Sequence, residues 1–424
     1  MQNQSVHPIL FFGLLLAVSS MSFPLGSNRD WIWPFYTIAY CCITMFLLID
    51  VKNSMSMLSH SSVRSTLLLF AGLILWIAIQ HFGLPPLLAP LSIDQFSTVK
   101  DLLKTITYLC VFFAIVSLIN TRFRSLCLVY AILIAALIQA IIGSIATLQE
   151  AQQTARGTFP NANHFAGYLE MSIGLGIGLM IAMQDQQKKV GRERILGWMH
   201  AISGPKARLR LMLLIMVIGL VMSASRMGNI ALFSSIIITT ACYAIMQRRL
   251  HKMTAMFLAS ILVIDVAVIG NYFGIDRVSQ RLQTMTLETE TRDEINQYSL
   301  QILNDYPWVG TGAGTYEVIF TRYRGPDISE RITNAENDYL EFLIELGIIG
   351  CIPLLLIVLA GLWTQIRLLR HRSQFTRGVA FGCLTGTISL LIHSATDFNL
   401  QIPSNAALFL VLLALPQALA QHDI

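Results

Sequence analysis

A polar cluster stands directly before an apolar stretch in the last quarter of the chain. Glu336, Asn337 and Asp338 precede a predominantly apolar run that continues past Gly350. A carboxylate beside a low-dielectric boundary can have its pKa tuned to accept a proton from a hydroxyl group, so Glu336 is the candidate general base. The structural alternative is that acidic residues are favoured at a helix N-terminus and that Asn337 or Asp338 caps the helix. Both interpretations predict that a helix begins here.

Three arginines also stand just before segments that are expected to be helical. Arg226 lies in the short turn SASRMGN (223–229), Arg292 opens the segment 292–305, and Arg156 precedes an apolar run. The planar guanidinium group binds phosphate oxygens with two parallel hydrogen bonds. The alternative for each arginine is a solvated charge, or a side chain that extends to lipid headgroups. Together the three predict a site for a phosphate-bearing lipid headgroup.

Other motifs favour structural roles. The glycine-rich run GTGAGT (310–315) has no strand before it and no lysine after it, so we interpret it as a turn and not as a nucleotide loop. GLGIG (174–178) is typical of close helix packing. No His, Cys and carboxylate cluster has the spacing of a zinc site, and no metal or other cofactor is expected.

Four further polar residues fall within or beside apolar runs. Glu170 and Asp265 lie inside such runs, where an ionisable residue is either paired internally or marks a polar cavity. For His393 and Asp397, at the end of another run, a structural hydrogen-bonding role is the expectation. No Ser-His-Asp arrangement can be placed on one side of a membrane from the sequence.

The elements that must hold these residues are membrane helices. The chain has 424 residues, of which 54% are hydrophobic and only 12% charged, whereas about 25% is usual in soluble proteins. Apolar runs long enough to cross a bilayer recur throughout. We therefore predict an all-α polytopic membrane protein with twelve transmembrane helices. The predicted spans cover residues 8–26, 31–50, 64–82, 103–119, 125–148, 164–184, 209–224, 229–246, 253–272, 338–364, 377–395 and 404–420.

The basic residues predict the orientation of these spans. If both termini are cytoplasmic, 18 of the 29 Lys and Arg residues fall in the cytoplasmic loops, as the positive-inside rule requires. The net charge of +5 is then mainly a topology signal, and no DNA-binding motif accompanies it. Residues 8–26 lack a small-residue cleavage site, so they predict a first anchor and not a signal peptide. The seven cysteines fall inside spans and are expected to be reduced.

The chain divides into three parts. Residues 1–272 hold spans one to nine, residues 273–337 form a large loop on the outer side, and residues 338–424 hold spans ten to twelve. A loop of that length is expected to be functional. Within it, Ile295, Tyr298, Ile302 and Leu303 recur at roughly helical spacing and predict an amphipathic helix over 292–305, which Pro307 and GTGAGT end.

Five stretches of the chain occur in a characteristic order and spacing. They are RGTFPNANHFAGYL (156–169), SASRMGN (223–229), TRDEINQYSLQILNDYPWVGTGAGTY (291–316), NAENDYLEFLIELGIIG (334–350) and HSATDFNLQIPSNAALF (393–409). Together they resemble the O-antigen ligase and polymerase superfamily of bacterial inner-membrane glycosyltransferases, over about residues 150–410.

The resemblance implies a GT-C-like helical fold with a large periplasmic loop over an outward-facing cavity. It also implies transfer of a glycan from an undecaprenyl-diphosphate carrier to an acceptor sugar hydroxyl, without metal or nucleotide. Arg226 and Arg292 match the family arginines that hold the diphosphate, and Glu336 stands where ligases carry a histidine. Arg156, Asn337 and Tyr339 are expected to contact substrate.

Three functions stay open at this stage. The glutamate at position 336 favours a polymerase that extends an O-antigen-like or exopolysaccharide chain; a ligase that moves finished polymer to a lipid A core or another acceptor is the alternative. A secondary transporter would use Asp265 and Glu170 but would not require the arginines, and a structural scaffold leaves them unexplained. The expected partners are the carrier-linked glycan, an acceptor glycan or glycolipid, and a chain-length regulator at loop 185–210, with no nucleic acid.

Overall fold

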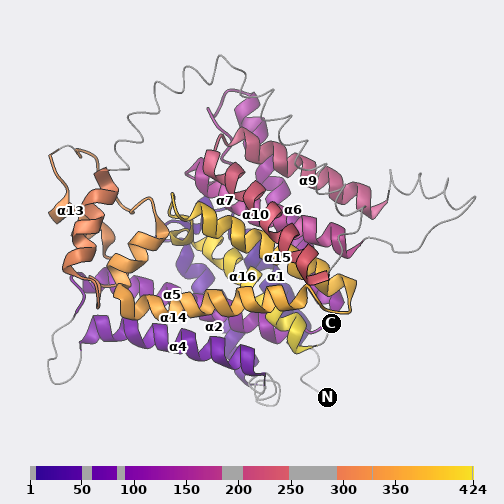
Figure 1. Cartoon of the computed structure of the whole chain (residues 1–424), viewed down its shortest axis with the longest axis horizontal. Helices are drawn as coiled ribbons and strands as arrows, with labels where there is room; N and C mark the ends of the chain where they lie inside the picture. The colour runs from indigo at the N-terminus through magenta and orange to yellow at the C-terminus, as the bar shows by residue number, and fades with distance from the viewer. Residues whose placement is uncertain are drawn as a thin grey trace, which may run out of the picture.

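The computed structural model shows an all-helical bundle with a small helical lobe at one end (Figure 1). It describes residues 6–49, 60–83, 91–183, 204–247, 294–326, 328–422 and 424, and contains no strand among them. The long helices are α1 (Val6–Ser20), α2 (Trp33–Ile49), α4 (Ser61–Phe82), α5 (Gln95–Leu118), α6 (Arg122–Leu148), α7 (Ala162–Ala182), α9 (Pro205–Met222), α10 (Arg226–Gln247), α14 (Asp338–Leu368), α15 (Gln374–His393) and α16 (Pro403–Gln421).

These helices correspond to eleven of the twelve predicted spans, and the remaining prediction, 253–272, lies outside the described residues. Within the described part of the chain, eight helices are long and apolar enough to cross a membrane. They are α4, α5, α6, α7, α10, α14, α15 and α16. α1 and α2 are shorter apolar helices. The chain is therefore a multi-pass membrane protein.

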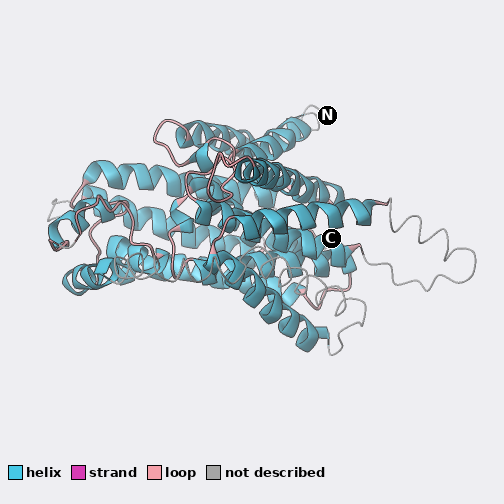
Figure 2. Cartoon of the chain, turned by 90° about the horizontal axis from the view of Figure 1, so that it is seen from above, coloured by secondary structure: helices cyan, strands magenta, loops and turns pink. Residues whose placement is uncertain are grey.

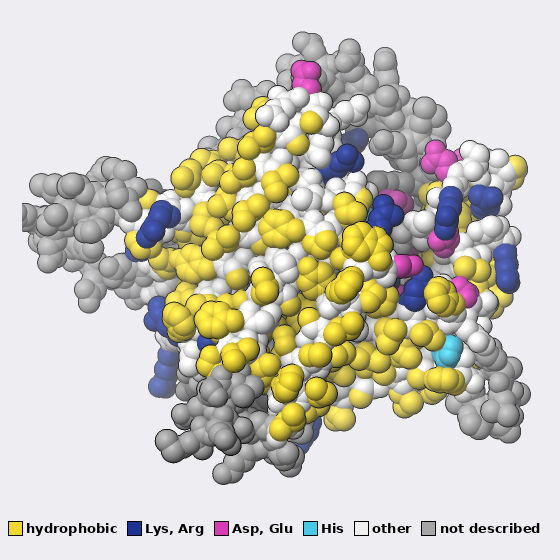
Figure 3. All heavy atoms as spheres, turned by 180° about the vertical axis from the view of Figure 1, so that it is seen from behind, with side chains coloured by type: hydrophobic (Ala, Val, Ile, Leu, Met, Phe, Trp, Pro, Cys, Tyr) yellow, Lys and Arg dark blue, Asp and Glu magenta, His cyan; other side chains and the backbone are white. Residues whose placement is uncertain are grey.

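The outer surface of the bundle is apolar, as a lipid-facing surface must be. Large side chains such as Phe12, Leu75, Leu355 and Trp363 are exposed on three different helices. Figure 3 shows one face on which hydrophobic side chains cover the broad middle of the molecule. An exposed apolar surface of this extent is not found on a soluble monomer and indicates contact with hydrocarbon.

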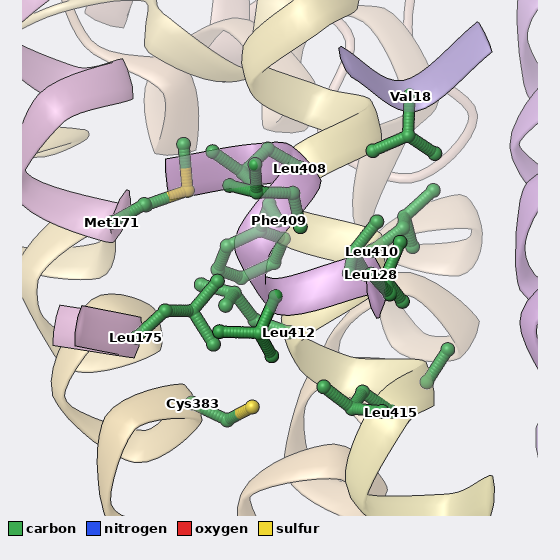
Figure 4. Packing of buried hydrophobic residues seen from close by; sticks show 14 of the residues in the cluster. Val18, Leu128, Met171, Leu175, Cys383, Leu408, Phe409, Leu410, Leu412 and Leu415 are labelled. Carbon is green, nitrogen blue, oxygen red and sulfur yellow. The ribbon is translucent and has the colours of Figure 1, made fainter. Parts of the chain in front are cut away.

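The centre of the bundle is formed by α7, α15 and α16, and the residues of α7 are buried along its whole length. Leu175 of α7, Cys383 of α15 and Leu412 of α16 pack together in the hydrophobic core (Figure 4). α7 and α15 approach so closely that glycines meet: a Cβ on Gly174 would lie 2.7 Å from the backbone nitrogen of Gly386. The prediction of a packing face at GLGIG (174–178) is confirmed, because small residues let two helix backbones touch.

A small lobe covers the end of the bundle at which α14 begins, here called the loop end (Figure 2). The lobe comprises residues 294–336, with a helix over 294–305 and α13 (Tyr316–Tyr323). Its own core includes Ile295, Ile302, Tyr316 and Phe320, and Leu340 of α14 joins it. The predicted amphipathic helix is confirmed over its described residues, and its apolar face packs within the lobe.

The glycine-rich turn of the lobe enters a break in α14. Gly347 has φ 64° and ψ 176°, which interrupts the helix that was predicted to run continuously through 338–364. The N–H groups of Thr311 and Gly312 donate to the carbonyls of Ile344 and Glu345, at 2.9 and 3.0 Å. Across the break, Ile348 N–H donates to the carbonyl of Pro307 at 2.9 Å. Residues 307–312 thus form hydrogen bonds with backbone groups that the break in the helix leaves without an intrahelical partner. The turn predicted at GTGAGT therefore has a structural role.

Candidate active site

Arg226 is the first residue of α10 and lies exposed at the loop end. The turn before it is held by local hydrogen bonds, with Gly228 N–H donating to Ser225 Oγ at 3.3 Å and Asn229 Nδ2 donating to the Ser225 carbonyl at 2.7 Å. Gly228, two residues after Arg226, faces the end of α15: a Cβ there would lie 3.4 Å from Cε1 of His393. The start of α10 is therefore packed against the last turn of α15.

Glu336 precedes α14 and is half-buried, with an unusual positive φ of 52°. Asn337 is the N-cap, and its Oδ1 accepts the N–H groups of Tyr339 and Leu340 at 3.0 and 3.2 Å. Of the two residues predicted to cap the helix, Asn337 is therefore the one that does so. Asp338 N–H donates to the carbonyl of Ser394 at 3.0 Å, directly after α15. The start of α14 is consequently packed against the same turn of α15 as the start of α10.

Arg156 lies in the loop that leads into α7 and is exposed. Its Nη1 donates to the carbonyl of Pro160 at 3.4 Å, so the side chain is oriented along its own loop. The first turn of α7 then reaches the segment after α15, because Nε2 of His164 lies 3.2 Å from Oδ1 of Asp397. Arg156, Arg226 and Glu336 therefore all lie at or just before the starts of helices that begin at the loop end, around the last turn of α15.

The other predicted site residues have mixed outcomes. Arg292 lies outside the described residues, as does Asp265. Tyr339 is 44% exposed, and its hydroxyl donates to the carbonyl of Leu391 at 2.5 Å. The Asn337 Oδ1 is used by the helix cap, so the predicted substrate contact would fall to its Nδ2 group. Asp338 is buried, and its Oδ2 accepts Leu400 N–H at 3.0 Å.

Two buried histidine–carboxylate pairs lie beneath this site. His393 Nδ1 lies 3.0 Å from Oε1 of Glu170, whose second oxygen accepts the hydroxyl of Ser389 at 2.9 Å. Glu170 is therefore paired internally, and the expectation of structural hydrogen bonding for His393 and Asp397 is confirmed. Sequence reasoning missed the pairings, although the ionisable Glu170 within a span was a signal that a partner existed.

The second pair is His164 with Asp397, and Asp397 lies in the segment between α15 and α16. Burial would raise the pKa of Asp397, but the hydrogen bond and charge of His164 outweigh it and leave that pKa below its ordinary value. Asp397 Oδ1 also accepts Phe398 N–H at 2.8 Å. The carboxylate form is thus the one that the fold stabilises.

A cavity of about 460 Å³ opens beside the start of α14. Its walls come mainly from α4, α5, α14 and α16. It passes from Tyr339, Leu391 and Leu400 at the loop end to Phe70 and Val358 further along the bundle. The lining is almost entirely apolar, with Asp101, Lys104 and Glu345 as its charged members. Such a cavity suits a hydrocarbon chain. In the described part of the chain, no three His, Cys, Asp or Glu side chains are grouped to hold a metal ion.

The fold and the site define a polytopic α-helical membrane protein with a polar site at one end of the bundle and an apolar cavity beside it. Residues 211–355 match the Wzy_C family model, whose description is O-antigen ligase. The match runs from α9 into the first half of α14 and includes Arg226, Arg292 and Glu336. It identifies the O-antigen ligase and polymerase family, which implies a glycan-transferring membrane enzyme with lipid-linked glycan substrates. No curated protein matches the chain.

Proposed function

We propose that this protein polymerises undecaprenyl-diphosphate-linked repeat units into O-antigen or exopolysaccharide at the periplasmic face of the bacterial inner membrane. One observation carries the proposal. The segments bearing Arg226 and Glu336 both pack on the last turn of α15, through Gly228 against His393 and through Asp338 N–H on the Ser394 carbonyl. A phosphate-binding group and a base are needed at opposite sides of one reacting sugar, and these two segments supply them.

The proposed reaction is an inverting displacement at the anomeric carbon. The acceptor hydroxyl oxygen attacks that carbon, its proton passes to the Glu336 carboxylate, and the bond from the carbon to the diphosphate oxygen breaks. Undecaprenyl diphosphate leaves as a stable anion, so no general acid is required. Arg226, with Arg292 and Arg156, stabilises the charge that develops on the leaving oxygen, and orientation of the hydroxyl supplies much of the remaining acceleration. We expect the arginines to neutralise the diphosphate without a metal ion.

The apolar cavity supports a lipid-linked donor. Its loop-end wall contains Tyr339, three residues after Glu336, and the cavity continues along α14 between membrane-spanning helices. A carrier whose diphosphate lies at Arg226 could therefore place the first part of its isoprenoid chain in the cavity and the rest in the bilayer. This use of the cavity also explains why its lining carries so few charged groups.

The proposed orientation follows from the basic residues at the two ends of the bundle. Arg122 and Arg124 begin α6, Lys206 lies at the start of α9, and Arg367 lies in the last turn of α14, all at the end opposite the lobe. By the positive-inside rule this end is cytoplasmic. With twelve spans, both termini are then cytoplasmic, and residues 273–337 are periplasmic.

A ligase that transfers finished polymer to a lipid A core or another acceptor is the second candidate, because the matching family model carries the description O-antigen ligase. The same site would serve it, with a different acceptor. A secondary transporter gains no support from Glu170, since that carboxylate is bound to His393 and Ser389.

The deciding experiment compares glycans in a strain with and without this gene. Carrier-linked and surface glycans are separated on gels and analysed by mass spectrometry. Single repeat units on the carrier, with no long chains, establish a polymerase, whereas long chains that stay on the carrier establish a ligase. If the profile is unchanged in a strain with no second enzyme of this family, the proposed function is wrong.

A further inference from the structure

The backbone on the C-terminal side of Glu336 is fixed by α14 and α15. Asp338 N–H donates to the carbonyls of Ser394 and Asp397, at 3.0 and 3.2 Å, and Asn337 caps the helix with its side chain. These contacts set where residue 336 can lie but not which way its side chain points. The direction depends on the residues before it as well.

The N-terminal side is fixed by one buried carboxylate. Glu341, in the first turns of α14, turns back toward the chain that precedes its own helix. Its Oε2 accepts Ala335 N–H at 2.7 Å, and its Oε1 accepts Nδ2 of Asn334 at 2.8 Å. Glu341 is 2% exposed and Ala335 is fully buried. Both hydrogen bonds are shorter than the roughly 2.9–3.0 Å that is usual for an N–H···O contact.

Glu336 itself has a backbone conformation that needs such support. Its φ of 52° lies in the left-handed region, which is unfavourable for a residue with a side chain. Residues persist in such conformations only where the surrounding contacts determine them, and these positions cluster at functional sites. If residues 334 and 335 were released, the peptide before Glu336 could relax toward an ordinary conformation and carry the side chain with it.

We propose that Glu341 is a positioning residue that holds the Glu336 carboxylate in its working direction through the hydrogen bonds to Asn334 and Ala335. This inference rests on the proposed role of Glu336 as the base. Glu341 does not contact substrate, because it is buried and both of its oxygens are occupied. Its effect is therefore exerted on the step in which Glu336 takes the proton, and not on binding of the carrier-linked glycan.

The kinetic test compares three variants of the full-length protein in proteoliposomes with a lipid-linked donor. Glu341→Met keeps the size and removes both hydrogen bonds, and we expect kcat to fall about 100-fold while KM changes less than about threefold. Glu341→Gln keeps an acceptor for Ala335 and can donate to Asn334 once that amide turns, so its kcat should stay within about threefold. Glu317→Gln is the control, because it removes the charge from the exposed contact with Arg331 in the same lobe.

An unchanged kcat in Glu341→Met overturns the proposal. An equal loss of kcat in Glu341→Met and Glu341→Gln also overturns it, because the loss would then come from the missing charge and not from the missing hydrogen bonds. If Glu341→Met does not fold, Asn334→Ala removes one of the two donors from a half-buried loop position. We then expect kcat to fall about tenfold, and full activity of that variant overturns the proposal.

A second readout separates this inference from the proposed function. A nitroxide label attached at Glu336→Cys should become more mobile by electron paramagnetic resonance when Glu341→Met is added, and stay unchanged with Glu317→Gln. An immobile label in the Glu341→Met protein overturns the positioning even if Glu336→Gln is inactive. If Glu336→Gln is fully active and the label is mobilised, Glu336 is not the general base. The positioning by Glu341 then has no catalytic role.

Discussion

His393 Nδ1 and Glu170 Oε1 lie 3.0 Å apart between α15 and α7, at a depth where both side chains are almost inaccessible. Ser389, one turn earlier on α15, binds the other carboxylate oxygen at 2.9 Å. These bonds join two helices whose glycines already touch, so they fix the rotation of α15 about its axis. The first residues of α10 and α14 pack against the last turn of α15. The His393–Glu170 pair therefore helps to fix the position of the proposed site.

Glu170→Ala should lower the melting temperature of the purified protein. It removes the carboxylate that the His393 ring and the Ser389 hydroxyl share, and each unsatisfied buried group costs about 1–3 kcal/mol. Glu170→Gln keeps an oxygen and a nitrogen in place and should be milder. The measurement is thermal unfolding in detergent, followed by size-exclusion chromatography. Glu330→Gln, at an exposed position, is the control, and a Glu170→Ala protein as stable as this control would refute the structural role of the pair.

The membrane helices could be predicted because length and apolar character are local properties. The start of α14 was predicted at Asp338, since Asn337 is a strong N-cap. The start of α6 was predicted three residues late, because Thr121 caps a helix that opens with the charged residues Arg122 and Arg124. The break at Gly347 was missed, since it depends on residues 307–312 entering the helix from a distant part of the chain.

The individual candidate residues could be named from the sequence, but their arrangement in space could not. Arg226 and Glu336 were chosen from their positions beside apolar runs, and the structure brings their segments to the same turn of α15. The pairing of Glu170 with His393 joins residues far apart in sequence, which no local pattern could indicate. Glu341 is close in sequence to its partners Asn334 and Ala335, but the contacts depend on how the chain turns back on its own helix, which the sequence pattern does not indicate.

Glu336→Gln should reduce transfer far more than Asp338→Asn does. If Glu336 accepts the hydroxyl proton, its loss removes a general base, which is worth about 10²–10⁴-fold in rate. Asp338 is buried and binds the backbone of Leu400, and the asparagine side chain in Asp338→Asn would keep an oxygen for that N–H. Polymer formation from a lipid-linked donor in proteoliposomes measures both. Equal, mild losses would favour the alternative in which the acidic cluster only stabilises the helix N-terminus.

Arg226→Ala and Arg292→Ala should each abolish transfer while the protein still inserts into the membrane. A planar guanidinium group that binds the leaving diphosphate cannot be replaced by a methyl group, and removal of one such donor costs about 10²–10³-fold. Arg226→Lys should recover only part of the activity, because an ammonium group lacks the two-pronged geometry. Glycan gels and membrane fractionation are the two measurements. Full activity of both alanine variants would contradict the diphosphate site.

Gly347→Ala should destabilise the protein, whereas Gly72→Ala should not. With φ 64° and ψ 176°, Gly347 lies in a region that is essentially limited to glycine, at a cost of about 1–3 kcal/mol for other residues. A Cβ there would also lie 2.3 Å from the carbonyl oxygen of Trp308. Gly72 is inside α4 with nothing within 4 Å of an added Cβ, so alanine should stabilise it by about 0.5–1 kcal/mol. Equal melting temperatures of the two variants would show that the break at Gly347 is not a conformational requirement.

Asp397→Asn should lower stability at neutral pH by an amount that disappears in acid. The pKa of Asp397 is below its ordinary value of 3.8, so the folded state favours the carboxylate. That contribution is complete above 3.8 and is lost as the pH falls through the lower folded value. The difference between wild type and variant, about 1–3 kcal/mol in stability at pH 7, should therefore narrow only at pH values below 3.8 when melting temperatures are compared. A difference that stays constant from about pH 7 to about pH 3 would mean that the loss comes from altered packing around His164, and that the charge of Asp397 contributes nothing to the fold.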